Sequence, residues 1–79
     1  MIKEITIFAT NNNGDIIEKQ NGIDYIDLIS TVTIFFQKYI KNADQKKIDK
    51  FIDELIVVGN TKFISENNRA TVFATGIKT

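Results

Sequence analysis

Two aspartates one helical turn apart are the residues of this chain whose spacing could most directly support catalysis. Asp24 and Asp27 could act as paired carboxylates in general acid and base chemistry. The same two positions begin a helical hydrophobic pattern. There, one aspartate can cap free N–H groups and the other favours the positive end of the helix dipole. We therefore interpret the pair as the start of a helix rather than as a catalytic site.

Nucleophilic and metal chemistry lack their usual residues in this chain. It contains no His and no Cys, so no imidazole can activate Ser30 or Ser65, and thiolates and disulfides are absent. Ser30 is followed three residues later by Thr33, so a Ser-x-x-Lys pair is also missing. The glycines are isolated turn residues and form no loop that could cradle phosphates. We predict that the protein is not an enzyme and uses no cofactor or metal.

The asparagine run at 11–15 is similar in composition to a calcium loop. Its Gly14 comes too early for the register of such a loop, and the flanking residues alternate as strands do. Asn13-Gly14 is the strongest short signal for a β-hairpin, because both residues tolerate positive φ. The run therefore predicts a hairpin.

The charge balance argues against nucleic acid as a partner. The chain has 10 Lys and Arg against 10 Asp and Glu, whereas nucleic-acid binders usually carry a basic excess. Lys46, Lys47 and Lys50 are interleaved with aspartates, which is typical of a solvated helix face. No apolar stretch reaches membrane-spanning length, and the first residues do not resemble a signal peptide. We predict a cytoplasmic protein with no membrane span.

Hydrophobic periodicity divides the chain into strands and helices. The residue pattern predicts strands at 2–10, 15–19, 61–65 and 69–75, and the apolar run at 55–58 predicts a buried strand. Helical spacing predicts a long helix at 25–41, and Asp44 could cap a shorter helix through Ile48, Phe51 and Ile52. The predicted fold is a single α+β domain over residues 1–79. It has a five-stranded antiparallel sheet in β-β-α-(α)-β-β-β order, with the long helix packed on one face.

The long helix is more apolar than one sheet can cover. One stripe consists of Ile26, Ile29, Thr33, Phe36 and Ile40, and its neighbour consists of Tyr25, Leu28, Val32, Phe35 and Tyr39. Together they span an arc of roughly 200°, whereas a surface helix needs about 100°. Either the short segment around Phe51 covers the second stripe, or a partner helix does. The aromatic residues of the second stripe favour a partner, because Tyr and Phe are enriched in interface cores.

Small size also favours self-association. A chain of 79 residues buries only about 60% of the surface that its unfolded form exposes. Disulfides, metals and oligomerisation are the usual remedies, and the first is excluded by composition. We predict that Tyr25, Leu28, Val32, Phe35 and Tyr39 contact a second copy.

A second apolar surface is expected on the sheet. If Ile5, Ile7 and Ala9 face the helix, then Phe8 faces away among threonines, as Phe73 does on the last strand, and Phe63 could join them. The face is either a partly exposed sheet surface or a second contact surface.

The order of elements resembles the roadblock family, of the dynein light-chain type, and the related longin domains. The residues that carry the resemblance are Ile5-Thr6-Ile7-Phe8-Ala9-Thr10, the turn and strand at 13–17, and the tail at 53–64 and 69–76. The resemblance implies a dimer that pairs through the long helix and an adjoining edge strand, here 55–58. It thereby adds Leu55 and Val57 to the interface. It further implies a platform for small Ras-like GTPases, motor complexes or signalling scaffolds.

These observations lead to two functional hypotheses. The first is a homodimeric scaffold or interaction module that regulates a small Ras-like GTPase. The alternative is a small protein encoded by a virus or mobile element that binds and inhibits a host complex. The short chain, the frequent Ile, Asn and Lys typical of AT-rich genomes, and the missing catalytic motifs are compatible with that class.

Overall fold

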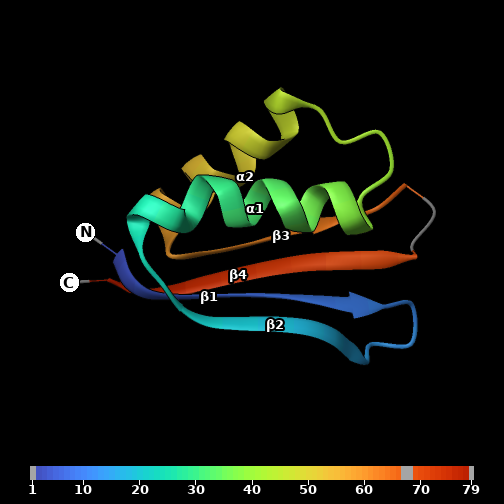
Figure 1. Cartoon of the computed structure of the whole chain (residues 1–79), viewed down its shortest axis with the longest axis horizontal. Coiled ribbons are helices and arrows are strands. Elements are labelled where there is room, and N and C mark those ends of the chain that lie inside the picture. The colour runs from blue at the N-terminus through green and yellow to red at the C-terminus, as the bar shows by residue number, and fades with distance from the viewer. Residues whose placement is uncertain (1, 67–68, 79) are drawn as a thin grey trace.

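Four antiparallel strands form one sheet within residues 2–66 and 69–78, which the computed structural model describes, and two helices cover one face of that sheet (Figure 1). The elements are β1 (Ile2–Asn11), β2 (Ile16–Ile23), α1 (Tyr25–Tyr39), α2 (Gln45–Val58), β3 (Asn60–Ile64) and β4 (Ala70–Lys78). The strands lie in the order β2-β1-β4-β3, so β2 and β3 are the edges. The α+β class agrees with the prediction.

The predicted hairpin joins β1 to β2. The side-chain oxygen of Asn11 accepts hydrogen bonds from the N–H groups of Asn13 and Asp15, at 2.9 and 3.0 Å. Gly14 adopts φ 85°, which Gly tolerates without strain, and its N–H bonds to the Asn11 carbonyl at 3.0 Å. The polar run at 11–15 therefore closes a turn, as its sequence predicts.

Both helices begin after an aspartate, but only one aspartate caps. Asp44 accepts a hydrogen bond from the N–H of Lys47 at 2.9 Å, whereas the side chain of Asp24 makes no capping bond. The first helix ends at Tyr39, two residues before the predicted end, because Ile40 is already extended.

The five-stranded prediction is wrong, because 55–58 is the last turn of α2. The run from Leu55 to Val58 is strongly β-forming, but Leu55 continues the helical stripe of Ile48, Phe51 and Ile52 and is fully buried. Gly59 then ends the helix in the left-handed conformation, with φ 96°, and its N–H bonds to the Leu55 carbonyl at 2.8 Å. Helical burial and the glycine cap outweigh the local strand preference.

Replacing Gly59 with alanine is expected to destabilise the domain by about 1–2 kcal/mol, because L-residues are strained in the left-handed region. Gly59→Asn should cost less, since asparagine tolerates this conformation better. Urea unfolding followed by circular dichroism measures both. Equal stability of Gly59→Ala and the wild-type chain would contradict the assigned helix end.

The core lies between the helices and the inward side of the sheet. Phe36 of α1 is at its centre, with ring centroids 5.1 Å from Phe51 of α2 and 5.3 Å from Phe63 of β3. The sheet contributes alternate residues of β1 and β4, namely Ile5, Ile7, Ala9, Val72 and Ala74. The second helix thus covers the C-terminal half of one α1 stripe, at Phe36 and Ile40.

Candidate functional site

The side of α1 that faces away from the sheet carries exposed isoleucines and no charged residue. We call this surface the outer face of α1; it consists of Ile26, Ile29, Ser30, Thr33, Ile34 and Gln37. The three isoleucines are 92%, 61% and 49% exposed. The hydroxyls of Ser30 and Thr33 donate to helix carbonyls, at 3.1 and 2.8 Å, so both hydroxyl protons are already engaged. Three exposed isoleucines on two turns of helix are typical of a contact surface.

Most of the residues that we predicted for a partner lie against the chain's own core. Leu28, Val32 and Phe35 are at most 2% exposed, and Leu55 is fully buried. Tyr25 and Tyr39 are half-buried at the margin of the core, and Val57 is exposed on the last turn of α2. The two stripes of α1 have similar apolar content, so spacing alone did not show which one the sheet would cover. Of the exposed isoleucines, Ile26 and Ile29 belong to the neighbouring stripe, and Ile34 belongs to neither stripe.

Opposite charges lie at the two ends of α1. Asp24 and Asp27 are exposed at its beginning, and Lys38 and Lys41 are exposed at its end. The outer face is therefore an uncharged strip with an acidic end and a basic end.

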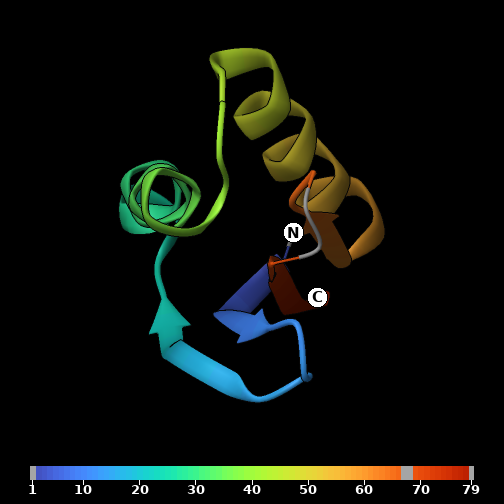
Figure 2. The ribbon, with the colours of Figure 1, turned by 90° about the vertical axis from the view of Figure 1, so that its right-hand side faces the viewer.

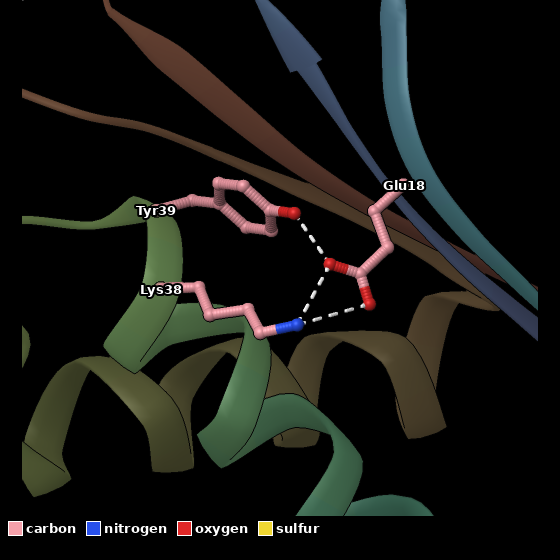
Figure 3. Close-up of polar contacts among 3 residues, drawn as sticks. All are labelled: Glu18, Lys38 and Tyr39. Carbon is pink, nitrogen blue, oxygen red and sulfur yellow. Dashed lines mark hydrogen bonds and ion pairs between the residues drawn. The ribbon is translucent and has the colours of Figure 1, made fainter.

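An ion pair between Lys38 and Glu18 ties the end of α1 to β2, and Tyr39 adds a hydrogen bond to the same carboxylate (Figure 3). The ammonium of Lys38 lies 3.2 Å from a carboxylate oxygen of Glu18, and the Tyr39 hydroxyl donates to the same oxygen. The hydrogen bonds from Tyr39 and Lys38 lower the pKa of Glu18 below its usual 4.5. The bond to Glu18 raises the pKa of Tyr39 to about 12.

Between pH 4.5 and pH 10.0, removing the Tyr39 hydroxyl is expected to destabilise the domain by about 1 kcal/mol. A partly exposed hydrogen bond to a charged group contributes about this much, because solvent screens it. Below pH 4.5 the difference between wild type and Tyr39→Phe should shrink, because protonation removes the charge that a lowered Glu18 pKa stabilises. It should also shrink from pH 10.0 towards about 12, because the raised pKa of Tyr39 stabilises the protonated phenol only below that range. Unfolding midpoints across pH test this, with Tyr25→Phe as control. A difference that does not change with pH would contradict the contact.

A second surface is the side of the sheet opposite the helices, which we call the bare face. Phe8 lies between the inward-facing Ile7 and Ala9, so it points to this side, and its ring stacks on Phe73 with centroids 4.9 Å apart and planes 9° apart. Phe63, by contrast, faces the helices and packs on Phe36. Two of the three predicted phenylalanines therefore come together, and the third belongs to the core side.

Within the described part of the chain, no helix is long and apolar enough to cross a membrane. The same residues contain no group of three acidic side chains placed to hold a metal ion.

Comparisons with protein-family models, with curated proteins and with solved structures find no match to this chain. The resemblance to roadblock and longin domains therefore stays a prediction. Its expected edge strand at 55–58 is helical.

Proposed function

We propose that this protein is a non-enzymatic interaction module that pairs with a second copy through the outer face of α1. The observation that carries the proposal is the exposure of Ile26, Ile29 and Ile34 on an uncharged helix face. Burying such side chains contributes about 1.5–3 kcal/mol each when burial is complete. The paired surface would add to the small stability expected of a domain of 79 residues.

The charge pattern of α1 favours a second copy as the occupant. In a two-fold pair each copy presents the same surface to the other. The two helices run antiparallel when the two-fold axis is perpendicular to α1. When the two copies cross at Ser30, Ile26 of one copy faces Ile34 of the other, and the acidic end of each α1 lies towards the basic end of its partner. A parallel arrangement would instead place like charges together.

The position of β2 is compatible with this pairing. It is the edge strand on the side of the sheet nearest α1 (Figure 2), and Glu18 joins it to that helix. Its outward N–H and C=O groups have no neighbouring strand within the sheet and can meet the same strand of the second copy. The edge strand of the proposed dimer is therefore β2 rather than residues 55–58.

A platform for a small Ras-like GTPase is the finer part of the proposal, and it rests on the resemblance alone. Calorimetric titration with purified Ras-like GTPases, loaded with GDP or with a GTP analogue, tests it. Binding to one nucleotide state supports this role, and no binding to either removes it while leaving self-association intact.

Light scattering across a concentration series tests the self-association. We expect twice the chain mass of 9.0 kDa at micromolar concentration. A constant mass of 9.0 kDa at every concentration up to the solubility limit would overturn the proposal.

A further inference from the structure

The register of the four strands lines up three rows of side chains across the bare face. The middle row consists of Lys19, Phe8, Phe73 and Lys62. On one side of it is a row of Ile16, Thr10, Thr71 and Ile64, and on the other is a row that includes Thr6, Thr75 and Asn60. The bare face thus has an aromatic centre, a lysine at each end of the central row, and no acidic side chain in these rows.

The aromatic centre is only half-buried, because both helices lie on the other side of the sheet (Figure 2). A hollow of about 670 Å³ is lined by Phe8 and Phe73 and also by Val58 of α2, so it extends from the ring pair round the β3 edge towards the helix layer. Glu54 also borders the hollow, but it accepts a hydrogen bond from Thr61 at 3.0 Å. A surface of this kind can receive an apolar anchor side chain.

The spacing of the two lysines fits a helix lying between them. Lys19 and Lys62 are both exposed and stand on the two edge strands, three strand spacings apart. That separation is about 14 Å between backbones. A helix with its side chains is about 10–12 Å across. A helix lying over the phenylalanines would therefore carry its flanking residues to the lysines on both sides.

We propose that the bare face binds an acidic amphipathic helix of another protein. The apolar side of that helix packs on Phe8 and Phe73, and carboxylates on its two flanks pair with Lys19 and Lys62. This would place a helical layer on each side of the sheet. The surface lies opposite the helix layer, so the inference does not depend on pairing through α1.

Single-stranded nucleic acid is the other polymer that combines aromatic contacts with lysines. Its affinity comes largely from many phosphate contacts and from bases stacked on free aromatic faces. The middle row supplies two lysines, and each ring already uses one face on the other. The observations therefore favour the acidic helix.

The test is an NMR titration of the isotope-labelled chain with a synthetic helix-forming peptide of about 18 residues, or five turns. The peptide carries a leucine stripe flanked by glutamates, and a matched peptide carries lysines in their place. We expect shifts at Phe8 and Phe73 with the glutamate peptide. The double variant Lys19→Glu with Lys62→Glu should weaken that binding at least tenfold and bind the lysine peptide instead. Lys46→Glu with Lys50→Glu, on α2, is the control with equal charge change and should leave the preference unchanged.

Three results would overturn the inference. The first is no binding of the glutamate peptide to a folded chain, as judged by its NMR spectrum. The second is equal binding of both peptides, or a preference that does not respond to the lysine substitutions. The third is tighter, salt-dependent binding of an oligothymidylate at the same residues. Peptide-induced shifts confined to the outer face of α1 would also contradict binding at the bare face. They would not bear on the dimer, which light scattering tests separately.

Discussion

Replacing Ile26 and Ile29 together with aspartate is expected to convert the dimer into a stable monomer. Both side chains are exposed in the single chain, at 92% and 61%, so their replacement removes little from its own core. In the pair, four carboxylates would be brought together in an apolar contact without partners, which is costly. We expect at least a hundredfold weaker association, or about 2.7 kcal/mol. Sedimentation equilibrium measures the association, and urea unfolding of the dilute protein shows that the fold is retained.

The control for this variant is Ile64→Asp. Ile64 is a similarly exposed isoleucine, but it belongs to β3 on the bare face. The Ile64→Asp substitution should leave the association of the two copies unchanged. A monomeric Ile64→Asp together with a dimeric Ile26→Asp, Ile29→Asp chain would show that copies meet through the sheet instead of through α1.

Replacing Phe36 with alanine is expected to remove a large fraction of the domain's stability. Its side chain is fully buried and packs against Phe51 and Phe63, so the change leaves a cavity where α1, α2 and β3 meet. Such truncations cost about 3–5 kcal/mol. A domain of 79 residues has only about 4–12 kcal/mol of stability in total. Chemical unfolding followed by near- and far-ultraviolet circular dichroism measures the loss.

Two substitutions on the same helix provide the comparison. Phe36→Leu keeps much of the volume and should cost less than the alanine variant. Ile34→Ala, on the outer face, should change the stability of the dilute monomer by no more than about 0.5 kcal/mol. A similar loss for Ile34→Ala and Phe36→Ala would contradict the orientation of α1 on the sheet.

Local periodicity predicted those parts of the fold that depend on neighbouring residues. Ile5, Ile7 and Ala9 alternate with polar or outward residues, and they do form the inward side of β1. The Asn13-Gly14 turn and the beginning of α1 are likewise local, and both were predictable from residue type and spacing. The α+β class follows from these elements together.

The rest depends on contacts between distant segments. Residues 55–58 have strand-forming side chains, but Leu55 joins a buried stripe that starts at Ile48, two turns earlier in α2. Leu28, Val32 and Phe35 of one α1 stripe lie in the core. Phe51 and Phe63 bury Phe36 of the other stripe, so the spacing within the helix could not show which isoleucines stay exposed. The row from Lys19 to Lys62 needs the register of four strands, including a shift between Ala9 and Thr10 that no local pattern predicts.

The most direct measurement of the central claim is cross-linking at position 30. Ser30 lies between Ile26 and Ile34 at the middle of the outer face, and the chain has no cysteine of its own. In an antiparallel pair the two copies of this position approach closely, and a disulfide needs Cα atoms within about 7 Å. Mild oxidation of Ser30→Cys should give a covalent dimer, whereas Lys46→Cys on α2 should stay a single chain. A Ser30→Cys chain that remains monomeric under oxidation, or cross-links no faster than Lys46→Cys, would contradict pairing through α1.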